Sequence, residues 1–221
     1  MTIFAAAHPL LAQALGERGF AILTDVQSAV LADSCYEQDL LVSAQTGSGK
    51  TVAFGLSMAA QLLESDAEND FPSQPAALVI TPTRELALQV KTELDWLYAK
   101  TGLVLASAVG GMDIRTERRA LSGRVDILIG TPGRLVDHLN KNSFDPSNLR
   151  VVVLDEADEM LDMGFREDLE TLLRAAPDQR RTLMFSATVP RTIAALARRY
   201  QQNAVRVETI SAEEQHKDIS Y

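Results

Sequence analysis

The sequence contains one cysteine, few aromatic residues, no excess of basic charge and no long apolar run. Cys35 alone cannot form an internal disulfide, which excludes a disulfide-stabilised scaffold and predicts a reducing, cytoplasmic location. No stretch of about 18 apolar residues occurs, so we expect no membrane span. The chain has 221 residues, of which 46% are hydrophobic, and this suits one globular domain with a substantial core.

The acidic net charge bears on nucleic-acid binding. The formal net charge is −9, whereas a protein that binds nucleic acid through one broad basic face has a high isoelectric point. A few local cations and oriented backbone amides can still hold a phosphate backbone. Arg84 and Arg134 each stand beside an expected turn or helix start and are candidates. A further basic group, which we interpret as a solvated helix face, comprises Arg115, Arg118, Arg119 and Arg124.

Short apolar runs alternate with amphipathic stretches along the chain. The runs predict strands near residues 39–43, 76–80, 103–108, 125–129, 150–154, 181–185 and 204–207. This alternation is typical of an α/β fold, namely a doubly wound, mostly parallel sheet with helices on both faces. Pro9 and Gly19 predict the two ends of a helix before the first strand. Residues 65–75 are polar and predict a surface loop, and residues 208–221 lose periodicity and predict a linker.

The segment AQTGSGKT, residues 44–51, has the composition of a phosphate-binding loop. It follows an apolar run and precedes a helix-like segment, which is the context that such a loop requires. The glycines let successive backbone N–H groups point at a phosphate, Lys50 supplies a charge, and the Thr51 hydroxyl can bind Mg²⁺. We expect nucleotide contacts from the whole phosphate loop: Ala44, Gln45, Thr46, Gly47, Ser48, Gly49, Lys50 and Thr51.

Carboxylates follow the apolar run at residues 151–154. A buried parallel strand would deliver Asp155 to the edge of the sheet where ligands bind, and Asp155 would there hold Mg²⁺. Glu156 is then placed to orient and deprotonate a water molecule. The alternative is an ordinary acid-rich helix start. The upstream phosphate loop favours the catalytic interpretation, with Lys50, Asp155 and Glu156 as the catalytic group.

Seven short motifs in order give the chain a resemblance to the DEAD-box family of RNA helicases over nearly its whole length. They are GFAILTDVQ (19–27), AQTGSGKT (44–51), PTRELALQ (82–89), the glycine pair Gly110 and Gly111, TPGR (131–134), DEAD (155–158) and SAT (186–188). The resemblance implies a RecA-like P-loop NTPase domain over residues 1–207, which includes a Q motif region over residues 4–27. It also implies that residues 208–221 begin a linker to a second RecA-like domain that this chain does not contain.

The resemblance also assigns residues to the nucleotide and to RNA. Gln27 would pair with the adenine edge, and a side-chain amide offers the matching donor and acceptor. Phe20 would stack on the base, although ordinary packing is an equal alternative. The implied RNA contacts are Thr83, Arg84, Gly111, Thr131 and Arg134. Asp158, Ser186 and Thr188 would couple the nucleotide state to RNA binding, whereas alone they could be helix caps.

The implied function is the ATP-binding core of an ATP-dependent RNA helicase, an RNA-dependent ATPase. Its cofactors would be ATP or ADP and Mg²⁺, and its partners would be RNA, through backbone contacts, and the second RecA-like domain. We expect the isolated domain to be monomeric and nearly inactive. Two alternatives stay open, a non-catalytic adenine-nucleotide or RNA-binding module and a small-molecule P-loop kinase. A kinase would require a phosphate acceptor, whereas Glu156 indicates hydrolysis by water.

Overall fold

A computed structural model describes residues 4–63 and 74–209. The loop expected over residues 65–75 and the linker after residue 209 lie almost wholly outside these described ranges. Within them, no helix is long and apolar enough to cross a membrane.

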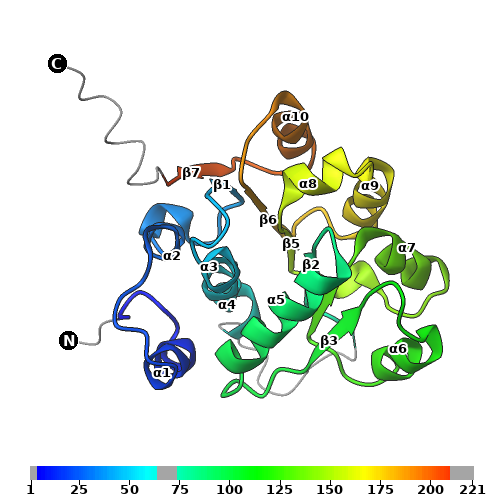
Figure 1. The fold of residues 1–221 in the computed structure, drawn as a ribbon, viewed down its shortest axis with the longest axis horizontal. Helices are drawn as coiled ribbons and strands as arrows, with labels where there is room; N and C mark the ends of the chain where they lie inside the picture. Colours follow the sequence, from blue (N-terminus) through cyan, green and yellow to red (C-terminus); the bar gives the residue numbers. More distant parts are fainter. Residues whose placement is uncertain (1–3, 64–73, 210–221) are drawn as a thin grey trace.

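A seven-stranded parallel sheet forms the centre of the fold (Figure 1). Its order is β3-β4-β2-β5-β6-β1-β7, and every recorded strand pairing is parallel. The strands are β1 (Leu40–Ser43), β2 (Ala77–Ile80), β3 (Leu105–Ala108), β4 (Ile127–Gly130), β5 (Val151–Leu154), β6 (Arg181–Ser186) and β7 (Val205–Glu208). All seven predicted strands are confirmed to within two residues.

The last strand extends one residue beyond its predicted end at residue 207, into the first residue of the expected linker. Glu208 is the last residue of β7, and it is paired in register with Ser43 of β1. The backbone N–H of Thr209 also donates to the Ser43 carbonyl at 3.1 Å. The sheet therefore continues beyond the last apolar residue because backbone pairing does not require an apolar side chain at the end of an edge strand.

Helices cover both faces of the sheet, as Figure 1 shows. The helices are α1 (Pro9–Glu17), α2 (Asp25–Val30), α3 (Lys50–Ser57), α4 (Ala59–Leu63), α5 (Arg84–Leu97), α6 (Ile114–Leu121), α7 (Pro132–Asn140), α8 (Ala157–Asp162), α9 (Arg166–Ala175) and α10 (Arg191–Tyr200). Successive strand residues point to opposite faces. Val79 therefore packs in the core cluster with α1–α5, and Leu78 and Ile80 pack in the cluster with α6–α10.

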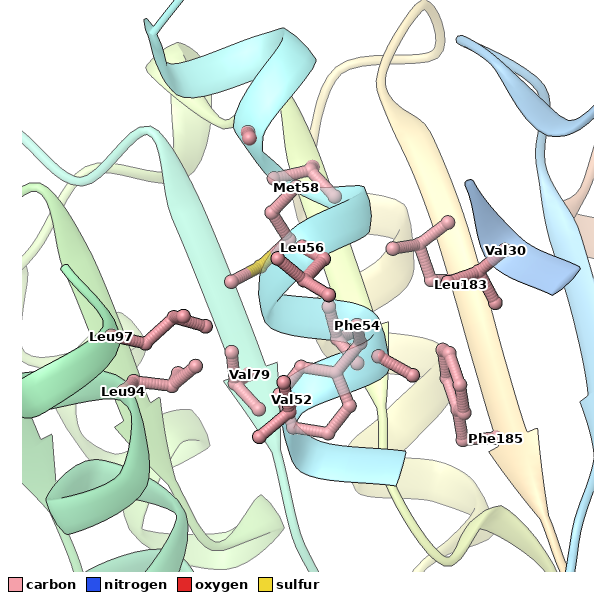
Figure 2. Close-up of a cluster of buried hydrophobic side chains, with 14 of the residues drawn as sticks. Val30, Val52, Phe54, Leu56, Met58, Val79, Leu94, Leu97, Leu183 and Phe185 are labelled. Atoms are coloured by element: carbon pink, nitrogen blue, oxygen red, sulfur yellow. The ribbon is translucent and has the colours of Figure 1, made fainter. Parts of the chain in front are cut away.

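Close packing fixes helix α3, which begins at the end of the phosphate loop. Figure 2 shows its side chains between α5 on one side and β6 on the other. The rings of Phe54 and Phe185 meet edge to face, with centroids 5.5 Å apart. The Tyr98 hydroxyl, at the end of α5, donates to the Gly55 carbonyl at 2.6 Å. The phosphate loop is thus attached to a helix that is held by the core.

Gly130, at the carboxyl end of β4, has no room for a side chain. A Cβ there would lie 2.4 Å from the Ala108 carbonyl oxygen of neighbouring β3. We expect Gly130→Ala to lower the free energy of unfolding by about 1–3 kcal/mol, because the backbone of β3 must move. Gly16→Ala in α1 is the matched control, since its Cβ would meet nothing within 4 Å. Denaturant titration measures both, and equal effects would contradict this prediction.

Candidate functional site

The functional residues gather at one edge of the sheet because all its strands are parallel. The phosphate loop follows β1, Asp155 follows β5, and Ser186 ends β6. Thr131 follows β4 and belongs to the same edge. This is the carboxyl edge, where open α/β sheets bind ligands. The structure therefore brings the sequence-predicted residues to a common side of the molecule.

The phosphate loop presents exposed residues in front of a helix start. Gln45, Thr46 and Gly47 are exposed, while Lys50 is buried as the first residue of α3. Gly49 caps this helix with φ of 89°, a left-handed conformation that favours glycine. The first N–H groups of a helix have no partner within the helix and suit an anion. The Ser48 hydroxyl is also buried, with no hydrogen-bond partner among the described residues.

Lys50 joins the phosphate loop to the end of β5. Its ammonium donates to the Ala44 carbonyl at 3.1 Å and lies 2.8 Å from the Glu156 carboxylate. Glu156 itself has φ of 50° and ψ of 53°, which is unusual for a residue other than glycine. Such backbone conformations cluster at functional sites. Two of the three predicted catalytic residues, Lys50 and Glu156, are therefore in direct contact, an arrangement that the sequence did not predict.

Asp155 is a buried carboxyl group beside this ion pair. It is 2% exposed, and its Oδ1 accepts the Glu156 backbone N–H at 3.1 Å. Burial, and then the neighbouring Glu156 charge, raise the pKa of Asp155 to about 7, although the Lys50 charge opposes this shift. A buried carboxylate in this position fits a divalent cation, which would compensate its charge. Together with the Thr51 hydroxyl at the start of α3, this donor chemistry fits Mg²⁺.

Gln27 connects α2 to the phosphate loop. It forms a capping box with Thr24, in which the Gln27 carbonyl oxygen accepts the Thr24 N–H at 3.0 Å. Its side-chain Nε2 donates to the Gly49 carbonyl at 3.3 Å. Gln27 is 1% exposed. An amide has two donors and two lone pairs, so one of each is not used by the bonds to Thr24 and Gly49.

Phe20 packs within the protein. Its ring lies 5.7 Å from the Trp96 ring of α5 and is half-buried against the core of that face. Phe4, at the start of the described residues, is also buried in this core. The packing alternative for Phe20 is therefore realised, and base stacking by Phe20 stays a prediction.

The predicted coupling residues contact one another. Thr188 donates to the Asp158 carboxylate from its hydroxyl at 2.8 Å and from its backbone N–H at 3.0 Å. The Ser186 hydroxyl accepts the Asp158 backbone N–H at 3.3 Å. Burial would raise the pKa of Asp158, but the hydrogen bonds from Thr188 and Ser186 outweigh it and lower that pKa. Asp158 is therefore held as a carboxylate between α8 and the segment after β6.

The predicted RNA residues Thr83, Arg84 and Gly111 lie at loop and helix ends. The Thr83 hydroxyl caps α5 by accepting the Leu86 N–H at 3.2 Å, and the exposed Arg84 begins that helix. Gly111 is exposed with φ of 79°. A Cβ at Gly111 would lie 2.8 Å from an Arg84 guanidinium nitrogen, so these two residues are neighbours.

Thr131 and Arg134 begin helix α7, and Arg134 is held by groups from α6 and the preceding loop. Thr131 is the N-cap residue, but its side chain makes no capping hydrogen bond. The Arg134 guanidinium donates to Glu117 at 3.2 Å and to the Met112 carbonyl at 3.2 Å. Glu117 was not predicted from the sequence as a functional residue. Its signal is a carboxylate on the apolar stripe of α6, between Ile114 and Leu121.

The basic residues that we interpreted as a solvated face divide into two groups. Arg115, Arg118 and Arg119 are exposed on α6, as expected. Arg124 instead pairs with Asp126, with a nitrogen–oxygen distance of 3.0 Å. In the described ranges, no group of three or more His, Cys, Asp or Glu side chains could hold a metal ion by itself.

Two cavities lie at opposite ends of the strands, and only one of them is at the carboxyl edge of the sheet. One, of about 440 Å³, is lined by Thr46, Thr83, Glu156 and Asp158 and joins the nucleotide residues to α5. A larger one, of about 630 Å³, lies near Arg181 at the opposite ends of the strands. Arg181 donates to the backbone carbonyls of Gln38, Ser57 and Cys35, which makes its role structural. The smaller cavity is therefore the one associated with the site.

Fold and site together define a RecA-like P-loop nucleotide-binding domain: a parallel sheet with a glycine-rich loop between β1 and a helix, and a carboxylate pair at the carboxyl end of β5. Comparison with known proteins narrows this class. The sequence profile of the DEAD/DEAH box helicase family matches residues 24–196, and the chain belongs to that family. The resemblance inferred from the motifs is therefore confirmed.

Individual relatives agree with this assignment. The chain is 40% identical over 207 residues to the DEAD-box ATP-dependent RNA helicase 3A, chloroplastic, of Zea mays, covering 93% of this chain and 28% of the relative. It is 42% identical over 206 residues to the ATP-dependent RNA helicase RhlB of Serratia proteamaculans, covering 92% and 48%. The chain therefore spans less than half the length of these relatives.

Solved structures confirm the fold. A DEAD box protein from the hyperthermophile Methanococcus jannaschii matches with a TM-score of 0.83 and 35% identity over 92% of this chain and 54% of that chain. A hypothetical ATP-dependent RNA helicase from Sulfolobus tokodaii matches with a TM-score of 0.80 and 32% identity, covering 90% and 56%.

Proposed function

We propose that this chain is the ATP-binding core domain of an ATP-dependent RNA helicase, in which RNA-stimulated ATP hydrolysis drives local unwinding of RNA duplexes. The observation that carries the proposal is the 2.8 Å contact between Lys50 of the phosphate loop and Glu156 of the DEAD segment. It places a phosphate-binding charge beside a candidate general base. The single cysteine supports a cytoplasmic location, and we propose that the domain alone is monomeric.

In this proposal each residue of the nucleotide site has one task. The phosphate loop binds the phosphates with its backbone N–H groups, and Lys50 exchanges its partner Glu156 for phosphate oxygens. Glu156 is then released to orient a water molecule and accept its proton. Thr51 and Asp155 would hold Mg²⁺. When bound, Mg²⁺ supplies Lewis-acid charge neutralisation at the phosphates.

RNA would bind across the ends of α5 and α7 and the glycine pair. Arg84 and Arg134 supply charge at these ends, and the exposed backbone of Gly111 permits close approach of a phosphate. We call the surface formed by Arg84, Gly111 and Arg134 the RNA track. The acidic charge of the remaining surface then limits RNA binding to this track. The hydrogen-bonded group of Asp158, Ser186 and Thr188 would transmit the nucleotide state to that track.

Adenine selectivity tests the nucleotide half of the proposal. We expect the chain to bind Mg-ADP about 10- to 30-fold more tightly than Mg-GDP, because two hydrogen bonds from Gln27 are each worth about 1 kcal/mol. Gln27→Ala should reduce ADP affinity to the GDP level. Calorimetric titration of both nucleotides provides the measurement.

Gln27→Ala can have two effects, because Gln27 also donates to the Gly49 carbonyl of the phosphate loop. The titration with GDP distinguishes them. Loss of adenine recognition weakens ADP alone, whereas a loosened phosphate loop weakens ADP and GDP equally. Gln89→Ala, which removes an exposed glutamine that bonds Glu93 on α5, is the control and should change neither affinity. Equal affinity of the unaltered chain for ADP and GDP would exclude the adenine assignment.

A further inference from the structure

A buried carboxylate lies between the glycine-pair loop and helix α7. Glu117, on α6, is 3% exposed. Its Oε1 accepts the backbone N–H of Val109 at 2.9 Å. Its Oε2 lies 3.2 Å from an Arg134 guanidinium nitrogen and 2.7 Å from His138 Nε2. The carboxylate of α6 therefore contacts two other segments of the chain: the residue directly after β3, and α7 at two of its side chains.

The buried Glu117 carboxylate depends on all three of its partners. A carboxylate is costly to bury unless opposite charge and hydrogen bonds compensate it. Arg134 supplies the charge, and its side chain is only 13% exposed. Val109 and His138 supply hydrogen bonds, with His138 itself completely buried. Since each partner is held by its own element, the position of Glu117 is the one in which its carboxylate makes all three contacts.

The contacts of Glu117 fix the positions of residues in the RNA track. Val109 directly precedes Gly110 and Gly111, so its bond to Glu117 holds the backbone of that loop. Arg134 is held at two points, because its second nitrogen donates to the Met112 carbonyl just after the loop. Gly111 in turn borders the Arg84 guanidinium. One carboxylate thus joins segments that carry three of the proposed RNA contacts.

Arg134 keeps capacity for RNA in this arrangement. A guanidinium has five N–H donors in a fixed plane, and two of its recorded bonds go to Glu117 and Met112. Holding a long cationic side chain in place before RNA arrives reduces the conformational entropy that binding must remove. The two bonds, to Glu117 and to the Met112 carbonyl, therefore orient the remaining N–H donors of Arg134.

We propose that Glu117 is a positioning residue for RNA: it orients Arg134 and fixes the loop that carries Gly110 and Gly111, and His138 supports it from within α7. This inference rests on the proposed RNA-binding function. It assigns a role to a residue outside the seven motifs.

Glu117→Gln isolates the orienting role in the test. A glutamine carbonyl can still accept the Val109 N–H, but its amide nitrogen cannot accept from Arg134 or His138. Binding of a fluorescent single-stranded oligouridine by the 221-residue chain is measured by anisotropy at fixed salt, and Mg-ADP binding by calorimetry. We expect RNA affinity to fall about tenfold, the size of one lost charged hydrogen bond, and ADP affinity to stay within twofold.

A double-variant comparison distinguishes positioning from a general structural effect. If Glu117 acts through Arg134, Glu117→Gln should reduce RNA affinity no further once Arg134→Ala is present. Glu170→Gln is the matched control, because Glu170 also bonds arginines, Arg174 and Arg199, but joins α9 to α10 away from the track. It should leave RNA affinity unchanged. His138→Phe removes the support of Glu117 by a second route and should lower RNA affinity with ADP affinity unchanged.

The outcomes separate this inference from the proposed function. RNA affinity unchanged in both Glu117→Gln and His138→Phe would overturn the positioning role while RNA binding by the unaltered chain stands. Additive losses in the Glu117 and Arg134 double variant would also overturn it. An unaltered chain that binds ADP but not oligouridine would overturn the proposed RNA function itself, and the positioning role with it.

Discussion

Replacing Glu156 by glutamine is expected to lower kcat for RNA-stimulated ATP hydrolysis about 100-fold or more while ATP binding survives. The protein for this measurement is the domain joined to a second RecA-like domain. Glutamine keeps the shape of Glu156 and can still contact Lys50, which lies 2.8 Å from the carboxylate. It cannot accept a proton from water. The loss should therefore fall on the chemical step, as measured by steady-state turnover with saturating RNA.

Lys50→Ala provides the contrasting result. The Lys50 charge would touch the phosphates in the ground state and in the transition state, so its removal should weaken nucleotide binding as well as turnover. It also leaves the buried Asp155 and Glu156 without their neighbouring cation. Lys91→Ala, which removes an ion pair with Asp95 on the surface of α5, is the control. Turnover retained in Glu156→Gln would move the general base elsewhere.

The second large effect concerns the domain by itself. We expect residues 1–221 to fold and to bind adenine nucleotide, but to hydrolyse ATP about 10³- to 10⁵-fold more slowly than the complete helicase with RNA, the typical contribution of a transition-state arginine. Arg84 and Arg134, the candidate cations beside the site, are engaged at the glycine-pair loop rather than at Glu156. The matched region covers only 28% and 48% of the two relatives, which leaves room in them for an arginine from a second domain.

The sheet could be predicted from sequence because buried parallel strands are short and continuously apolar. Residues 151–154, for example, are four branched apolar residues in a row, and all four are buried in β5. The edge strand β7 was harder, because Arg206 and Glu208 are exposed and the pairing comes from the backbone. The phosphate loop was predictable for another reason: its chemistry depends on residues that are consecutive in sequence.

The contacts within the site could not be predicted because they join residues that are distant in sequence. Lys50 meets Glu156, and Glu117 meets His138, only after the strands are ordered in the sheet. The spacing of the three histidines gave no indication of the contact between His138 and Glu117. Gln27 combines two local bonds to Thr24 with one distant bond to Gly49, and only the local pattern is readable in advance.

A coupled ATPase assay of residues 1–221, with and without single-stranded RNA, tests the central claim most directly. The claim is that this chain is a nucleotide-binding core whose hydrolysis depends on a second RecA-like domain. The predicted result is nucleotide binding by calorimetry with almost no turnover in either arm, and RNA-dependent turnover once the second domain is joined to it. Robust RNA-dependent turnover by residues 1–221 alone would contradict the account, because the catalytic site would then be complete within this domain.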